Sequence, residues 1–123
     1  MTINQAKKII EANYAMKENA LTRFMYDDCV FSVDAFWEFY DAVACVTGAL
    51  EKTEALTTQI TVAYQKILKE ILYHFAPSDA AVMKDFPENY NDYMERLDYA
   101  VLAYLENKPE YLADERFDLQ RTP

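Results

Sequence analysis

Apolar residues recur at steps of three and four along most of this chain, which is the spacing of one face of an α-helix. The pattern is clearest between residues 53 and 75, where an apolar side chain returns at Leu56, Ile60, Ala63, Ile67 and Ile71. Further apolar residues widen this stripe at Tyr64, Leu68, Leu72 and Phe75. A stripe this wide is typical of a helix that packs on more than one side, so the sequence predicts a central helix over residues 53–75.

A second helix is predicted close to the N-terminus. Thr2 and Gln5 have the spacing of a capping box, in which a hydroxyl and an amide side chain accept bonds from free backbone N–H groups. Apolar residues then follow at helical spacing, at Ile9, Ala12, Met16, Ala20 and Phe24. These positions predict one helix that ends near residues 27–28 and leads into a buried connection over residues 29–31.

Two more long helices follow from their end signals and apolar spacing. Ser32 or Asp34 can cap a helix that Gly48 ends. Its predicted inward face consists of Val33, Phe36, Trp37, Tyr40, Val43 and Ala44. The last long helix begins at residues 86–87, because Pro87 suits a first helical turn. Its predicted inward face consists of Tyr90, Tyr93, Met94, Leu97, Ala100, Val101, Tyr104 and Leu105.

Prolines mark the remaining boundaries. Pro77 cannot continue the central helix, and Ser78 can cap a short helix that runs through Val82 and Met83. Pro109 ends the last long helix and opens a short turn through Leu112.

The predicted elements combine into an all-α, single-domain antiparallel helical bundle with four main helices and one or two short ones. Composition agrees, because 52% of the 123 residues are apolar and a single glycine leaves few tight turns for a sheet. We expect the bundle to span residues 1–117 and the polar residues 118–123 to form a frayed tail.

Charge narrows the classes of partner. The chain carries 21 acidic and 12 basic residues, a net charge of -9, so neither direct nucleic-acid binding nor attraction to an anionic membrane is expected. No apolar run has the length of a signal peptide or a membrane span, so we expect a cytoplasmic protein. Cys29 and Cys45 each lie among apolar neighbours, as expected of buried thiols in a reducing compartment, although the sequence leaves a disulfide between them open.

Catalytic and cofactor motifs are not evident. His74 is the only histidine, which is too few for a paired Glu-x-x-His di-iron site or a zinc site, and its place near a helix C-terminus favours a structural role. We therefore expect no metal, no cofactor and no enzymatic activity. One enzymatic alternative remains, in which Glu38 with Asp41 and Glu95 with Asp98 hold Mg²⁺ for the hydrolysis of a nucleotide.

Acidic residues form two rows at helical spacing. Asp34, Glu38 and Asp41 repeat at i, i+4 and i+7, and so do Glu88, Asp92 and Glu95. Rows of like charge do nothing for a helix, so they are either a solvated face or a surface for a cationic partner. Tyrosine suits interfaces because its ring buries area while its hydroxyl forms hydrogen bonds. Tyr90 and Tyr93 therefore join the six acids as the predicted partner-binding set.

These features predict a non-enzymatic module that docks on a basic surface of another protein. Small acidic helical proteins of this kind include immunity proteins that neutralise toxin nucleases and phage-encoded inhibitors of host defence, so by analogy of composition and architecture we expect an inhibitor or immunity-type protein. Two alternatives to the binding module remain. One is the Mg²⁺-dependent nucleotide hydrolase, and the other is a structural bundle that self-associates through its aromatic residues. We expect a monomer, or a homodimer that pairs through a face other than the acidic rows.

Overall fold

The predicted central helix is present as α4, Glu54–His74, in the computed structural model, which describes residues 1–49, 52–76 and 82–121. The Thr53 side chain caps its first turn by accepting a hydrogen bond from the backbone N–H of Leu56 at 3.1 Å. The buried face is the one that the sequence predicted: Leu56, Ile60, Ala63, Ile67 and Ile71. The wide flank is more exposed than expected, since Leu72 is 70% exposed.

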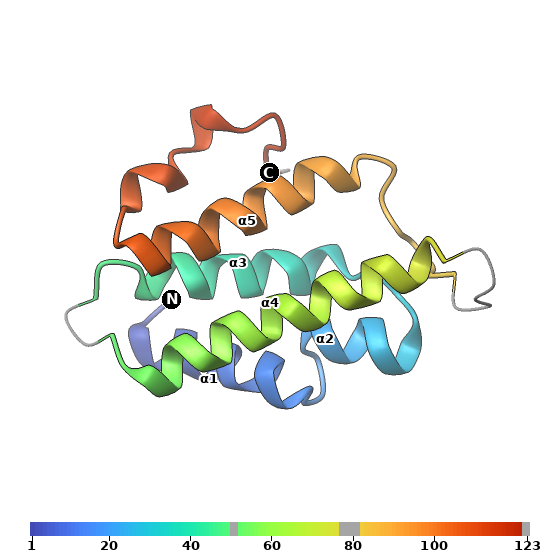
Figure 1. The fold of residues 1–123 in the computed structure, drawn as a ribbon, viewed down its shortest axis with the longest axis horizontal. Helices are drawn as coiled ribbons and strands as arrows, with labels where there is room; N and C mark the ends of the chain where they lie inside the picture. The colour runs from blue at the N-terminus through green and yellow to red at the C-terminus, as the bar shows by residue number, and fades with distance from the viewer. Residues whose placement is uncertain (50–51, 77–81, 122–123) are drawn as a thin grey trace.

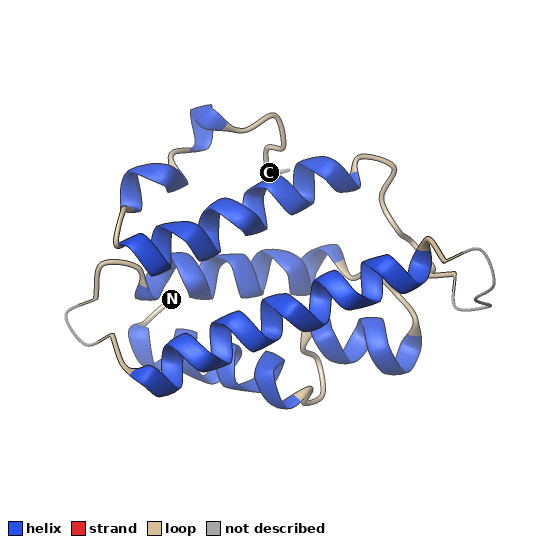
Figure 2. Ribbon diagram, viewed as in Figure 1, coloured by secondary structure: helices blue, strands red, loops and turns tan. Residues whose placement is uncertain are grey.

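Four long helices form the bundle: α1, Ile3–Ala15; α3, Val33–Val46; α4; and α5, Tyr90–Glu106. Consecutive long helices alternate in direction, with α3 lying between α1 and α5 and behind α4 (Figure 1). Shorter helices complete the chain: α2, Leu21–Arg23; the π-helix η1, Phe24–Asp28; and the 3-10 helices η2, Pro109–Leu112, and η3, Asp114–Arg116. The described residues contain no β-strand (Figure 2), so the all-α fold is confirmed.

The prediction for the N-terminal helix is wrong in its length and in the face that is buried. α1 ends at Ala15, and both Met16 and Asn19 adopt left-handed φ values, of 55° and 71°. The turn is stabilised by buried Asn13, whose side chain accepts from the Thr22 backbone N–H, while the Thr22 hydroxyl donates to the Asn13 carbonyl at 2.7 Å. The capping box at Thr2 is present, but the buried positions are Ala6, Ile10 and Asn13.

The inward face of α3 is rotated from the predicted one. Ser32 caps the helix as expected, and Gly48 follows its end with a φ of 81°. Val33 is exposed and Trp37 is only half-buried. The buried positions are Ala35, Phe36, Phe39, Tyr40, Ala42, Val43 and Val46.

The last long helix starts later than predicted, because Pro87 lies in the connection that precedes α5. Leu105, predicted to face inward, is exposed, and Tyr90, Tyr93 and Met94 are half-buried. The short turn predicted from Pro109 is present as η2. The short helix predicted from Ser78 lies mostly outside the described residues, and its last two predicted positions are not helical.

One buried cluster joins all four long helices, and the connection over residues 29–31 contributes Phe31 to it, as predicted. This connection is fixed by two backbone bonds, from Phe31 N–H to the Lys84 carbonyl and from Lys84 N–H to the Cys29 carbonyl. Both cysteines are half-buried and free, so no disulfide joins them. Among the described helices, none combines the length and apolarity needed to cross a bilayer.

Candidate functional site

The acidic row on α3 lies opposite the buried face of that helix. Asp34 and Glu38 are exposed, whereas Asp41 is half-buried. Asp41 binds Arg121 from the C-terminal end of the chain through two bonds, of 2.6 and 2.8 Å. The row therefore contains one carboxylate that already holds a cation and two that point to solvent.

The acidic row of α5 begins before the helix does. Glu88 precedes α5 and is exposed, Asp92 lies in the first turn and is half-buried, and Glu95 is exposed. Within residues 1–49, 52–76 and 82–121, no lysine or arginine forms an ion pair with these three acids or with Asp34 and Glu38. Asp34 and Asp92 also stand in first helical turns, where a negative charge is favourable.

The two predicted interface tyrosines pack on the edge of the core. The Tyr93 ring lies 4.9 Å from the Phe36 ring and 5.4 Å from the Phe31 ring, between centroids, and this burial raises the pKa of Tyr93. The Tyr90 ring lies 5.0 Å from the ring of Phe75. These ring contacts show that both tyrosines contribute to packing. Because each tyrosine also keeps part of its surface exposed, a contribution to an interface stays a prediction.

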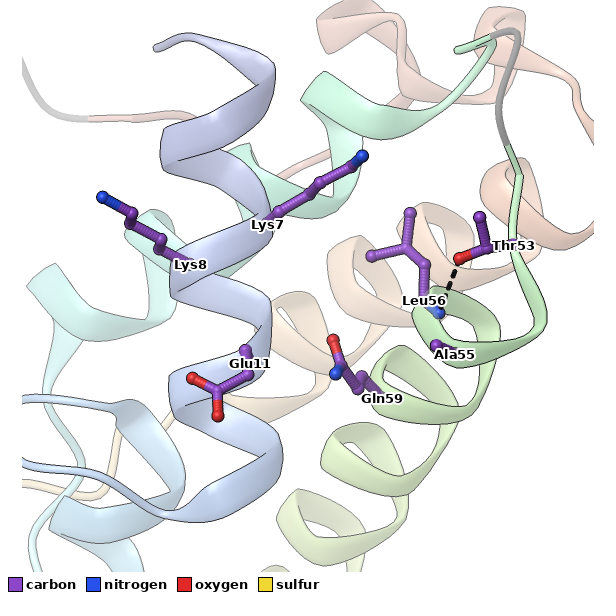
Figure 3. Close-up of a pocket in the computed structure, with 7 residues that line it drawn as sticks. All are labelled: Lys7, Lys8, Glu11, Thr53, Ala55, Leu56 and Gln59. Carbon is purple, nitrogen blue, oxygen red and sulfur yellow. Dashed lines mark hydrogen bonds between the residues drawn. The ribbon is translucent and has the colours of Figure 1, made fainter.

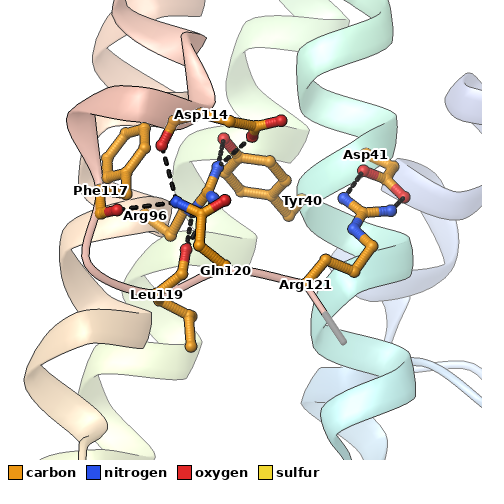
Figure 4. Close-up of polar contacts among 8 residues, drawn as sticks. All are labelled: Tyr40, Asp41, Arg96, Asp114, Phe117, Leu119, Gln120 and Arg121. Atoms are coloured by element: carbon orange, nitrogen blue, oxygen red, sulfur yellow. Dashed lines mark hydrogen bonds and ion pairs between the residues drawn. The ribbon is translucent and has the colours of Figure 1, made fainter. Parts of the chain in front are cut away.

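Arg96 of α5 is the most unusual side chain of the bundle, since its side chain is only 1% exposed (Figure 4). Its Nε and Nη2 donate to the Leu119 carbonyl at 3.0 and 2.7 Å. Its Nη1 donates to the Tyr40 hydroxyl at 3.1 Å and to the Asp114 carboxylate at 2.9 Å. The Phe117 ring covers the guanidinium at 4.3 Å. Arg96 thus fastens the C-terminal segment, residues 113–121, to α3 and α5.

The sequence prediction of a frayed tail from Asp118 is therefore wrong through residue 121. Leu119 is buried, and the Gln120 side chain donates to the carbonyls of Asp114 and Phe117, both at 2.8 Å. Arg96 is not among the residues predicted from the sequence, because the predicted inward face of this helix contains only apolar and aromatic residues. Its spacing was a usable signal, because Arg96 follows Tyr93 by three residues and precedes Ala100 by four, on the apolar face of α5.

A second cation lies over the outer face of α3. The Arg121 guanidinium binds both oxygens of Asp41 (Figure 4). The same guanidinium lies 4.5 Å from the centre of the Trp37 ring. The bond to Asp41 raises the pKa of Arg121, so the guanidinium stays positively charged at physiological pH. Trp37, predicted to belong to the core, instead lies at its edge and carries this arginine on its outer face.

The carboxylate pairs proposed for Mg²⁺ are not brought together. Asp41 is bound to Arg121, and Asp98 accepts a bond from the hydroxyl of Tyr64 on α4 at 3.1 Å. Burial and the neighbouring Asp98 raise the pKa of Tyr64 to about 12. No group of three or more metal-binding side chains occurs in the part of the chain that the structure describes.

His74 has a structural role in the described chain. Its Nδ1 accepts a hydrogen bond from the Met83 backbone N–H at 2.9 Å, and its ring stacks on Phe86 at 4.1 Å. These contacts fasten the end of α4 to the connection that leads to α5.

A shallow cavity of about 340 Å³ lies between α1 and the start of α4 (Figure 3). Lys7, Lys8 and Glu11 line one side, and the Lys7 and Lys8 ammonium groups point away from each other. The opposite side is formed by Thr53, Ala55, Leu56 and Gln59. Because its charged groups do not converge, this cavity has no arrangement that would bind a specific anion.

Comparisons with protein-family models, with curated proteins and with solved structures find no match to this chain.

Proposed function

We propose that this chain is a non-enzymatic protein-binding module that docks on a basic surface of another protein, and that it acts as an inhibitor or immunity-type protein. The observation that carries the proposal is a set of acids that form no ion pair with any residue described by the structure: Asp34, Glu38, Glu88, Asp92 and Glu95. These acids lie on α3 and α5 or just before α5, and α3 and α5 pack against each other.

The energetics favour a role in recognition. Clustered acids without compensating cations raise the negative potential of the surface, and repulsion between like charges in a row opposes the stability of the helix that carries them. A field of this kind accelerates the encounter with a basic partner more than it tightens the final complex. Affinity then depends on a few desolvated side chains, for which the half-buried rings of Trp37, Tyr90 and Tyr93 are the candidates.

The proposal is tested by reversing charge on both helices. A tagged chain captures its partner from source cells, and the purified pair is then studied by stopped-flow association at several ionic strengths. With Glu38→Lys and Glu95→Lys combined, we expect the association rate constant to fall by roughly tenfold and its salt dependence to flatten.

A matched control distinguishes the effect of where the charges lie from the effect of the total net charge. Glu110→Lys with Glu115→Lys changes the net charge equally, at exposed positions outside both acidic rows. This control should change the association rate much less. An association rate that responds equally to the two double variants, or a captured partner without a basic surface, would contradict the proposal.

The exposed apolar edge of α4 favours a second candidate, a bundle that self-associates. Leu68, Leu72 and Phe75 are exposed along this edge. Under the binding-module proposal, we expect light scattering to give the mass of a monomer at micromolar concentration. A stable dimer that Leu72→Glu converts to a monomer would support the second candidate instead.

A further inference from the structure

Trp37 and Asp41 stand four residues apart on α3, so their side chains share one face of the helix. Together they hold the Arg121 side chain, Asp41 through two hydrogen bonds to the end of the guanidinium and Trp37 through the face of its ring. We infer that Trp37 and Asp41 form a binding site for an arginine side chain of the partner protein, and that Arg121 occupies this site until the partner displaces it. The inference rests on the proposed function and names the side chain that the acidic surface recognises.

The geometry selects arginine over lysine. A guanidinium presents parallel N–H groups that match the two oxygens of a carboxylate, and its flat face stacks on an aromatic ring. Arg121 forms two bonds to Asp41, of 2.6 and 2.8 Å, and its guanidinium carbon lies over the Trp37 ring, 4.5 Å from the ring centre. A lysine ammonium is a point charge without this fork, so it would satisfy only part of the site.

The internal arginine is placed so that it can leave. The Arg121 side chain is 50% exposed and that of Asp41 is 36% exposed, and an exposed ion pair shifts an equilibrium by about fivefold or less. The next anchor inward is the Leu119 carbonyl, which Arg96 holds with two bonds. Arg121 can therefore swing away while residues 113–119 remain attached.

Exchange of this kind has a measurable signature. A tethered competitor acts at a high effective concentration, so Arg121 should weaken the binding of any free arginine group to the site. A partner overcomes this competition because its arginine belongs to a larger interface. Removal of Arg121 should therefore open the site to small arginine probes.

The test uses arginine amide as the probe and lysine amide as its matched control at equal ionic strength. Trp37 is the only tryptophan of the chain, so its indole N–H gives a single resonance in a nuclear magnetic resonance spectrum and reports on this site. In Arg121→Ala, we expect arginine amide to shift this resonance at a concentration about two- to fivefold lower than in the wild type. Lysine amide should have a smaller effect.

Two further variants keep the result interpretable. Arg121→Ala combined with Asp41→Asn should lose the response, because the carboxylate is gone while α3 is retained. Arg121→Lys should respond between the wild type and Arg121→Ala, because lysine occupies the site less well. Equal responses of the wild type and Arg121→Ala, or equal responses to both amides in Arg121→Ala, would overturn the inference.

This experiment needs no partner, so its outcome is separate from that of the proposed function. Charge reversal at Glu38 and Glu95 tests whether the acidic faces steer a basic protein. The amide titration tests whether Trp37 and Asp41 bind an arginine side chain. A positive titration with no effect of charge reversal would reject the proposed function and retain the arginine site, and the opposite result would reject the site alone.

Discussion

Arg96 and Arg121 both fasten the C-terminal segment to the bundle, but they do so in opposite surroundings. Arg96 is inside, only 1% exposed, and donates four hydrogen bonds to three acceptors. Arg121 is outside, half exposed, and bound to one carboxylate and one ring. The same guanidinium chemistry therefore serves two purposes, and burial decides which one.

At the inner attachment, burial makes the bonds from Arg96 to the Leu119 carbonyl and the Tyr40 hydroxyl hard to replace, whereas the Asp114 carboxylate is itself 77% exposed. The Leu119 carbonyl accepts two bonds from Arg96, and a buried acceptor that loses its donors costs about 1–3 kcal/mol. At the outer attachment, water can replace either partner. Exposed ion pairs contribute about 0.2–1 kcal/mol, and an exposed cation–π contact adds about 0.5–1 kcal/mol. The inner arginine, Arg96, therefore fixes the position of the C-terminal segment. The outer arginine, Arg121, can be exchanged for an arginine of a partner protein.

The largest expected effect follows from replacing the inner arginine. Arg96→Met keeps an unbranched apolar stem but lacks the guanidinium group and so removes all four bonds, and we expect the free energy of unfolding to fall by about 2–3 kcal/mol. Urea denaturation followed by circular dichroism measures the change. The C-terminal segment should also become sensitive to limited proteolysis.

Arg116→Ala is the matched control, because Arg116 belongs to the same segment but is exposed, and among the described residues its side chain interacts with the rings of Tyr99 and Tyr111 alone. Its loss should change the stability by about 0.5–1 kcal/mol at most. If Arg96→Met proved as mild as Arg116→Ala, with the segment still protected from protease, the contrast between inner and outer attachments would not hold.

The same contrast explains what could be predicted from the sequence. The buried face of α4 follows from the apolar spacing alone, because five apolar residues recur without a polar interruption: Leu56, Ile60, Ala63, Ile67 and Ile71. The break after α1 does not follow from spacing. It depends on Asn13 and Thr22, whose paired bonds stabilise the turn, and a pattern that counts only apolar residues has no place for a buried asparagine.

The candidate site was predictable in part. Helical spacing found the acids of both rows, and four of them are exposed: Asp34, Glu38, Glu88 and Glu95. Spacing within one helix could not find Arg121, because its contact with Asp41 spans 80 positions of the chain. Such a contact depends on where Arg96 anchors the segment, which is a property of the folded chain rather than of any local pattern.

The smaller expected effect concerns the outer attachment, and a double-mutant cycle measures it. Asp41→Ala and Arg121→Ala are made singly and together, and the difference between the double variant and the sum of the singles gives the coupling energy. We expect a coupling of about 0.2–1 kcal/mol in low salt, because both side chains remain partly exposed. In 1 M salt the screening length falls to about 3 Å, so the coupling should shrink further. Arg121 can give way to a partner only if this coupling is small. A coupling above about 2 kcal/mol that persists in high salt would make the outer attachment as permanent as the inner one, and Trp37 and Asp41 would then hold the chain's own end rather than receive an arginine from elsewhere.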